Sequence, residues 1–271
     1  MPHAMTALRN HCRLLAPLAL ALIVAGCASK EPAAPGIPEP LPPPKPQEVS
    51  PQRRAELHAE LGAGYYERGQ MDIALDELNE AVKLDPNYAR AYNIFGLIYA
   101  VLGETAKAEQ SFQRALALAP QDPEIRQNWG FYLCTHGRPR DSLAEFDAAI
   151  RNPLYKTPEI PLVNAGRCAA AAGDPRLAET YFRRALTLAA NNDAALLGLA
   201  QIAYREARNE EARRLIKSMR QAILPPVALY LGMCVERRLG DRQAETSYVT
   251  QLKNRYPDAE ETKAIATGTC E

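Results

Sequence analysis

The chain has few aromatic residues and no excess of charge of either sign. Its 271 residues include five Phe, one Trp and 12 Tyr, so a core must be built mainly from Leu, Ala, Ile and Val, which suits close-packed helices better than sheets. The 32 Lys and Arg balance the 32 Asp and Glu, which leaves no strongly basic surface overall to neutralise a nucleic-acid backbone. We therefore expect an all-α protein that binds no nucleic acid.

Catalytic and metal-binding motifs are also missing from the sequence. It contains no phosphate-cradling glycine loop, no cysteine pairs at zinc spacing and no His-Glu-x-x-His helix. His136 follows Cys134 closely, and a Cys–His nucleophile pair is the alternative to weigh there. No orienting acid or oxyanion donor can be identified, and a surface histidine at a helix end is far commoner. The sequence therefore predicts neither an enzyme nor a metal site.

The amino-terminal apolar segment is too short for a typical membrane-spanning helix. Leu14–Ala25 has 12 residues and contains Pro17, whereas a spanning helix needs about 20 residues. It follows Arg9 and Arg13, with no acidic residue before them. A basic segment followed by a short apolar one is typical of a secretory signal peptide. We therefore expect a cleaved signal peptide at residues 1–26 rather than a permanent membrane helix.

The signal peptide ends in Val24-Ala25-Gly26-Cys27, which resembles a bacterial lipobox. The resemblance implies that Cys27 carries a diacylglycerol and an N-acyl chain such as palmitate, and these lipids together give stable anchoring. The alternative is an ordinary signal peptide with a chance cysteine. Bacterial lipoproteins with Asp after the cysteine commonly stay in the inner membrane, whereas Ala28 follows here. We therefore expect a lipid anchor at the periplasmic face of the outer membrane, and no other cofactor.

Residues 27–54 contain a proline-rich segment. Nine of the chain's 22 prolines lie between Pro32 and Pro51, with almost nothing apolar to bury. Such a sequence favours extended polyproline II, which rises about 3.1 Å per residue. We expect a tether between the lipid and the folded part of the chain. The alternative is a proline-rich ligand for a groove on another domain.

The rest of the chain repeats at an interval of 34 residues, at which Gly62, Gly96 and Gly130 coincide. Three further columns contain Ala74, Ala108 and Ser142, then Leu78, Phe112 and Phe146, then Ala81, Ala115 and Ala149. This pattern resembles the tetratricopeptide repeat, in which each unit is a pair of antiparallel helices and small residues let the two backbones approach. The resemblance implies an all-α right-handed superhelix of about six helix-turn-helix repeats.

The repeats are expected to fill residues 55–258. Their ranges are 55–88, 89–122, 123–156, 159–192, 193–224 and 225–258. A two-residue insertion separates the third repeat from the fourth, and the fifth is short and departs most from the pattern. Residues 259–271 are expected to form a capping helix or a tail.

In repeats of this kind, certain positions of each first helix face the concave side of the superhelix, where partners usually bind. Carried onto this chain, these positions predict a partner-binding groove of Tyr66, Glu67, Arg90, Asn93, Leu97, Val101 and Phe131. Ala59, Ala63, Gln127 and Thr135 occupy further such positions. The apolar members would form a stripe that receives a helix or an extended segment. The alternative is that Leu97 and Val101 belong to the core between repeats.

Cys12 leaves with the signal peptide and Cys27 is acylated, which leaves an even set of cysteines. The set is Cys134, Cys168, Cys234 and Cys270. The first two are 34 residues apart, so they fall at near-equivalent places on neighbouring first helices, and the last two are 36 residues apart. In an oxidising periplasm we expect two disulfides, of which the first would contribute about 3 to 4 kcal/mol. The alternative is buried reduced cysteine.

Four strings resemble one family, the type IV pilus biogenesis lipoproteins. They are Asn128–Cys134, Asn152–Tyr155, Asn164–Cys168 and Leu252–Pro257. With the lipobox and the tether, the resemblance implies a pilotin, which helps a secretin subunit to reach the outer membrane and multimerise, and which catalyses no reaction. It also implies that a short helical part of the secretin lies in the early repeats against Tyr66. The alternative is a repeat scaffold lipoprotein that brings cell-wall (murein) enzymes together near peptidoglycan.

Overall fold

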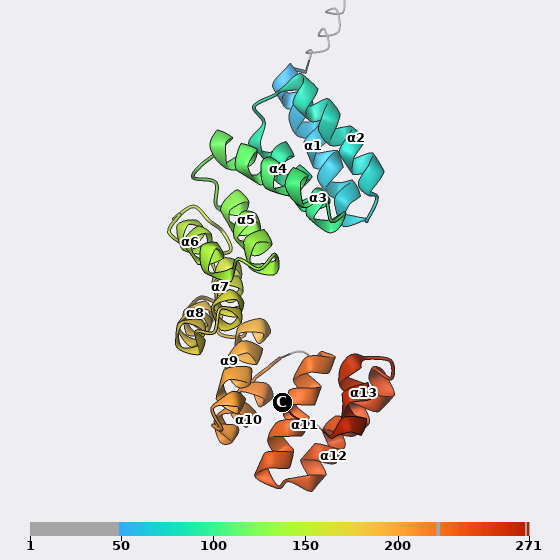
Figure 1. The fold of residues 1–271 in the computed structure, drawn as a ribbon, viewed down its shortest axis with the longest axis vertical. Coiled ribbons are helices and arrows are strands. Elements are labelled where there is room, and N and C mark those ends of the chain that lie inside the picture. The colour runs from blue at the N-terminus through green and yellow to red at the C-terminus, as the bar shows by residue number, and fades with distance from the viewer. Residues whose placement is uncertain (1–48, 221–222, 269, 271) are drawn as a thin grey trace, which may run out of the picture. The chain divides into compact units, whose positions relative to one another are not determined.

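The computed structural model describes residues 49–220, 223–268 and 270. Within this part of the chain all regular structure is helical, and it comprises thirteen α-helices (Figure 1). The predicted all-α fold class is therefore confirmed. The predicted signal peptide, the acylation site Cys27 and the tether as far as residue 48 lie outside the described residues.

Twelve of the helices form six consecutive pairs, and the last helix packs against the sixth pair. The first helices of the pairs are α1 (Pro51–Glu67), α3 (Ala89–Val101), α5 (Pro123–Thr135), α7 (Glu159–Ala171), α9 (Asp193–Arg205) and α11 (Pro226–Leu239). The second helices are α2 (Met71–Leu84), α4 (Thr105–Leu118), α6 (Pro139–Ile150), α8 (Pro175–Leu188), α10 (Asn209–Lys217) and α12 (Arg242–Arg255), and α13 (Glu260–Thr267) follows them. None of these described helices is long and apolar enough to cross a membrane.

A missing side chain lets the two helices of a pair approach each other. A Cβ atom added at Gly96 in α3 would lie 2.8 Å from the ring of Phe112 in α4, which is closer than real Cβ contacts come. The same holds at Gly166 in α7, where Phe182 of α8 would be 2.6 Å away. The coinciding columns of the sequence therefore pair a small residue on the first helix with a large, fully buried one on the second.

The turn inside each pair needs a residue in the left-handed region of backbone space. In five pairs that residue is a glycine with φ between 73° and 83°, namely Gly69, Gly103, Gly137, Gly173 and Gly240. The fifth pair has Ala207 at this place, with φ of 60°. A Cβ atom is strained in this region, so the repeat with the weakest sequence pattern also carries backbone strain at its turn.

Some of the described helices begin with a side-chain cap. The Asp122 carboxylate accepts hydrogen bonds from the backbone N–H groups of Glu124 and Ile125, at 2.9 and 3.1 Å, and Pro123 begins α5. Asp174 caps α8 in the same way through the N–H of Leu177, at 2.9 Å. These contacts satisfy backbone donors that the first helical turn leaves unpaired.

Two disulfides are present among the described residues, and each has the pairing that the sequence predicts. Cys134 of α5 joins Cys168 of α7, with their Cα atoms 5.8 Å apart. Cys234 of α11 joins Cys270 beyond α13, with their Cα atoms 5.6 Å apart. The first disulfide links neighbouring first helices, and the second links the segment that follows the last helix to the sixth pair.

Candidate functional site

A recess of about 270 Å³ lies between the first helices of the early pairs, and we call it the groove. Its walls come from α1, α3 and α5 and from the connection that leads into α7. The lining residues are Ala63, Tyr66, Glu67, Arg90, Asn93, Ile94, Leu97, Glu124, Gln127, Asn128, Tyr155, Thr157 and Ile160. Because the first helices of successive pairs lie side by side, residues far apart in sequence meet here.

The apolar part of the groove consists of side chains that also support the core. Tyr66 packs against the cluster formed by the first two pairs, and Leu97 packs against the cluster around Phe112 and Trp129. Both remain partly exposed. Burial raises the pKa of the Tyr66 hydroxyl above its ordinary value of 10.0. Tyr66 therefore offers an apolar ring face with a hydroxyl at its end.

A chain of hydrogen bonds forms the polar part of the groove. The Tyr155 hydroxyl donates to Oε1 of Gln127 at 3.2 Å, and Nε2 of Gln127 donates to Oδ1 of Asn128 at 3.2 Å. Nδ2 of Asn128 then donates to Oδ1 of Asn93 at 3.3 Å. Asn93 is 5% exposed, so its amide is held within the protein. The network links α3, α5 and the connection after α6, and it fixes the geometry of the recess.

Three charged side chains surround the opening of the groove. Glu67, Arg90 and Glu124 all line the recess and all are exposed. Two carboxylates against one guanidinium give the charged lining a net negative sign. An apolar side chain accompanied by a basic one is therefore the segment that this recess fits best.

Five of the seven predicted groove residues line this recess, and two do not. Val101 and Phe131 are 60% and 46% exposed and lie outside the lining. Of the four apolar side chains in the expected stripe, Tyr66 and Leu97 line the recess, beside the polar network. A part for Val101 and Phe131 in partner binding stays a prediction. Leu97 was expected either in the groove or in the core between repeats, and it takes part in both, since it lines the groove and also packs on the core.

Sequence reasoning missed several lining residues. Glu124, Asn128, Tyr155, Thr157 and Ile160 line the groove but were not predicted to do so. Tyr155 and Thr157 lie in the connection between the third and fourth repeats, near the two-residue insertion. Glu124 lies 34 residues after Arg90, so the period itself was the signal for it, whereas the insertion was the signal for Thr157.

The rejected nucleophile pair is absent from the described structure. Cys134 is held in a disulfide, and His136 stacks on the ring of Tyr132 with centroids 4.0 Å apart. Nδ1 of His136 also lies 2.9 Å from the backbone oxygen of Tyr132. Within the described residues, no group of three or more His, Cys, Asp or Glu side chains is arranged to hold a metal ion.

Comparison with known proteins places this arrangement in a family. Models of the tetratricopeptide repeat match residues 60–123 and 169–224. PilW, whose crystal structure is described as that of a widely conserved type IV pilus biogenesis factor, is 31% identical, with a TM-score of 0.72 over 78% of this chain and 98% of PilW. The chain belongs to the tetratricopeptide-repeat type IV pilus biogenesis proteins.

Other members of this pilus biogenesis family agree with that placement. The type IV pilus assembly protein PilF of Pseudomonas aeruginosa is 26% identical over 203 residues, which are 74% of this chain and 81% of PilF. A solved structure of Pseudomonas aeruginosa PilF shares the fold, with a TM-score of 0.73, 24% identity and coverage of 81% of this chain and 99% of that one. The predicted repeat fold is confirmed, and membership of a protein-interaction family confirms that the chain is not an enzyme.

Proposed function

We propose that this type IV pilus biogenesis protein is an outer-membrane pilotin. In this proposal it binds a short helical segment of a secretin subunit in the groove and promotes the localisation and multimerisation of the secretin in the outer membrane. The observation that carries the proposal is the groove itself, a pre-formed recess with an apolar wall, a hydrogen-bonded floor and a charged opening in a member of this family.

The groove suits a helical ligand with one apolar and one basic side chain. An apolar side chain of the secretin would pack against Tyr66 and Leu97, and a lysine or arginine one or two turns away would lie near Glu67 and Glu124. The polar network keeps these walls in place before binding, so little ordering is needed when the ligand arrives.

Anchoring is a separate part of the proposal. Acylation of Cys27 would hold the protein at the periplasmic face of the outer membrane, and the proline-rich tether would let the repeats reach a secretin subunit before it is assembled. The lipobox and the proline content of the sequence support this step.

The test measures heat-stable secretin multimers on unheated SDS gels of isolated outer membranes. Strains carry the wild type, a deletion, Cys27→Ala, Tyr66→Ala or Glu67→Lys. We expect the deletion to abolish the multimers, and Cys27→Ala to leave the secretin as monomer or in the inner membrane. Tyr66→Ala and Glu67→Lys should reduce multimers although the variant proteins remain anchored, because both residues line the groove and neither belongs to the anchor.

Leu61→Ala is the matched control for the groove variants. Leu61 lies in α1, like Tyr66, and is 48% exposed, but it does not line the groove. Its replacement should leave the multimers unchanged, and immunoblots should show equal amounts of all the variant proteins. Unchanged multimers in every strain would contradict the pilotin role and leave the cell-wall scaffold as the next function to test.

A further inference from the structure

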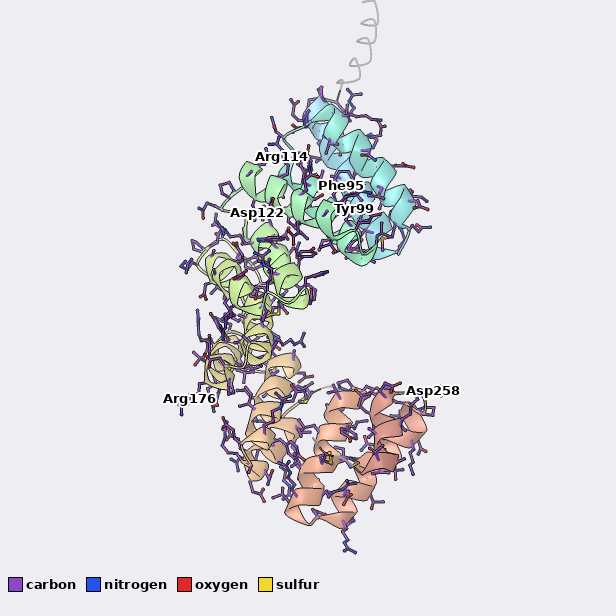
Figure 2. The ribbon with its side chains drawn as sticks, in the orientation of Figure 1. Phe95, Tyr99, Arg114, Asp122, Arg176 and Asp258 are labelled. Carbon is purple, nitrogen blue, oxygen red and sulfur yellow. A yellow bond between two sulfur atoms is a disulfide. The ribbon has the colours of Figure 1, made fainter. Side chains whose placement is uncertain are left out.

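A second recess, of about 750 Å³, lies where α2, α3 and α4 meet, and we call it the aromatic cleft. Residues that define it are Val82, Tyr92, Phe95, Tyr99, Lys107 and Arg114. Figure 2 labels three of them, Phe95, Tyr99 and Arg114. The α3 residues that line the cleft come two positions after those that line the groove, as Phe95 does after Asn93. Two positions correspond to a rotation of about 200° around the helix axis. The aromatic cleft and the groove therefore open on opposite sides of α3.

The floor of the aromatic cleft is a row of rings along α3. The centroids of Phe95 and Tyr99 are 5.9 Å apart with nearly parallel planes, and those of Tyr92 and Phe95 are 6.3 Å apart. Phe95 is 6% exposed, and the two tyrosines are partly buried. The row provides a firm apolar surface onto which a small number of apolar side chains can pack.

The rim of the aromatic cleft is basic. Nζ of Lys107 lies 5.3 Å from the centroid of Tyr99, and Cζ of Arg114 lies 5.6 Å from that of Tyr92. None of the described residues that line the cleft is Asp or Glu. Lys107 has an exposed partner in Glu104, at 3.3 Å, and such surface pairs exchange at little cost.

Arg114 keeps donors available for a ligand. Its Nη2 atom donates to Oδ1 of Asn87 at 3.0 Å and to the backbone oxygen of Pro86 at 3.4 Å. These bonds hold the guanidinium over Tyr92 but use one nitrogen of a group with five N–H donors. The remaining donors can bind a carboxylate in the forked geometry that arginine favours.

The aromatic cleft is a departure from the repeat, which argues that it is more than a consequence of the fold. Neighbouring pairs carry polar contacts at the equivalent positions, His58–Glu77 at 2.7 Å and Arg126–Glu145 at 2.6 Å. The second pair has Tyr92 and Ser111 there instead. The polar pair that bridges the two helices at this level in the first and third pairs is thus replaced by a ring and a short hydroxyl.

We propose that the aromatic cleft is a second docking site, for a short segment of a protein partner in which apolar side chains lie next to aspartate or glutamate. The apolar side chains would pack on Phe95 and Tyr99, and the carboxylates would bind Arg114 and Lys107. The charged lining of the groove has the opposite sign, so the two recesses select different segments. This proposal goes beyond the secretin assignment and does not depend on it.

The test uses the full-length protein in detergent micelles and two labelled helical peptides. One peptide has Leu and Phe on one face and Glu on the other, and the matched peptide has Lys in place of every Glu. Fluorescence polarisation measures the Kd of each, with peptide–micelle binding measured separately. We expect the acidic peptide to bind the aromatic cleft. We expect the basic peptide not to bind there. Arg114→Glu and Lys107→Glu should each weaken binding about tenfold, since each removes a charge-assisted contact.

Two further variants distinguish the aromatic cleft from its surroundings. Tyr99→Ala should weaken binding of the acidic peptide while circular dichroism shows that the protein remains folded. Arg176→Glu reverses an exposed arginine in α8, labelled in Figure 2, and should leave binding unchanged. The proposal is wrong if Arg114→Glu has no effect, or if Tyr66→Ala rather than Tyr99→Ala weakens binding. It is also wrong if no peptide binds and sedimentation shows dimers that Arg114→Glu dissociates, because the cleft would then be a contact between two copies.

Discussion

The amino-terminal half of the repeats (α1–α6) and the carboxy-terminal half (α7–α13) join their helix pairs in different ways. In the amino-terminal half the short ion pairs between helices, such as Arg126–Glu145, connect the two helices of one pair, and the ion pair between pairs, Arg138–Glu109, is 3.9 Å long. In the carboxy-terminal half ion pairs connect neighbouring pairs. Arg208 contacts Glu179 at 3.0 Å, and Arg213 of α10 pairs with the buried Glu236 of α11.

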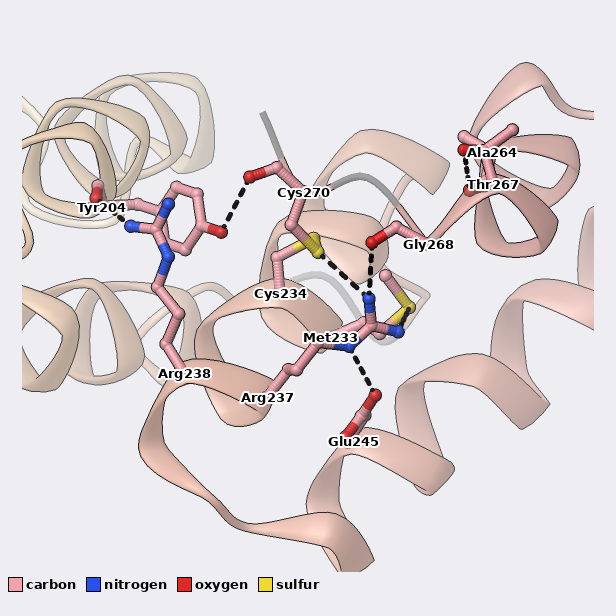
Figure 3. Close-up of a disulfide and its surroundings, with 10 residues drawn as sticks. All are labelled: Tyr204, Met233, Cys234, Arg237, Arg238, Glu245, Ala264, Thr267, Gly268 and Cys270. Carbon is pink, nitrogen blue, oxygen red and sulfur yellow. Dashed lines mark hydrogen bonds and ion pairs between the residues drawn. A yellow bond between two sulfur atoms is a disulfide. The ribbon is translucent and has the colours of Figure 1, made fainter.

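The end of the carboxy-terminal half shows the difference most clearly. Figure 3 shows Arg237 between Glu245 and Gly268, beside the Cys234–Cys270 disulfide. Its Nη1 donates to the Gly268 oxygen at 3.1 Å. The Tyr204 hydroxyl of the fifth pair also donates to the Cys270 oxygen, at 3.1 Å. Where the repeat pattern is weakest, in the fifth pair, short ion pairs join that pair to both of its neighbours. Among the described residues the early pairs have no ion pair this short between them, although the Cys134–Cys168 disulfide joins the third pair to the fourth, and their polar side chains line the groove and the aromatic cleft.

Removing the Cys234–Cys270 disulfide should have the largest effect on stability. Cys234→Ser with Cys270→Ser opens a loop of 36 residues, which should lower the free energy of unfolding by about 3 to 4 kcal/mol, as measured in guanidinium chloride. Hydrogen exchange should show that α13 loses protection, because the covalent link beyond it is gone.

The matched control is the same double substitution at Cys134 and Cys168. It should lower the free energy of unfolding by a similar amount but leave α13 protected, because that disulfide lies between α5 and α7. Equal loss of protection at α13 in both double variants would show that the link beyond α13 has no local role.

Crowding the contact between the two helices of the second pair should have the next largest effect on stability. Gly96→Ala places a Cβ atom 2.8 Å from the Phe112 ring, which should lower the free energy of unfolding by about 1 to 3 kcal/mol. Gly64→Ala is the control, because its Cβ atom would meet nothing closer than the Arg68 guanidinium at 3.7 Å. This second change should raise the free energy of unfolding by about 0.5 to 1 kcal/mol, and a loss there would contradict the packing argument.

Much of the fold could be predicted because the repeat leaves a periodic record in the sequence. Gly96 and Phe112 occupy two columns of the 34-residue pattern, and the contact between them explains why both columns exist. The groove was partly predictable for the same reason, since Tyr66 and Leu97 lie at periodic positions of the first helices. Val101 and Phe131 also lie at periodic positions but do not line the recess, because a periodic position alone does not say which neighbours a side chain meets.

The rest of the site could not be predicted, because it depends on departures from the period. Tyr155 reaches the groove from the connection between α6 and α7, which is longer than the connections between the earlier pairs. In the aromatic cleft Tyr92 and Ser111 replace a polar pair, and a single sequence does not show whether such a change fills a space or opens one. These features required the spatial arrangement of α2, α3 and α4.

Substitutions at the turns of the fifth and second pairs should change the free energy of unfolding by smaller amounts and in opposite directions. Ala207→Gly should raise the free energy of unfolding by about 0.5 to 1 kcal/mol, because it removes a side chain from the left-handed region. Gly103→Ala introduces the same strain in the second pair, at φ of 73°, and should lower the free energy of unfolding by about 1 kcal/mol. A shift of the same sign for both variants in thermal unfolding would contradict this account of the fifth turn.

The smallest effect concerns the ion pairs between helix pairs, and it should depend on pH. A hydrogen bond from Arg183 and the charge of Arg208 lower the pKa of Glu179 below its ordinary value of 4.5. The unfolded chain therefore takes up this proton first as pH falls, so the stabilisation is complete above the ordinary pKa and is lost as pH falls through the folded one. Glu179→Gln should lower the free energy of unfolding at pH 7 by about 0.2 to 1 kcal/mol and reduce its acid dependence.

Glu80 of the amino-terminal half provides the control for this pH dependence. Its pKa is also lowered, by a hydrogen bond from Lys83 three residues away, but the pair is exposed and lies within one helix. Solvent and salt screen such a contact, so Glu80→Gln should change the pH profile of unfolding less than Glu179→Gln does. Equal changes would mean that connecting two helix pairs adds nothing to an ion pair, and the contrast between the two halves would then rest on the disulfide and the packing alone.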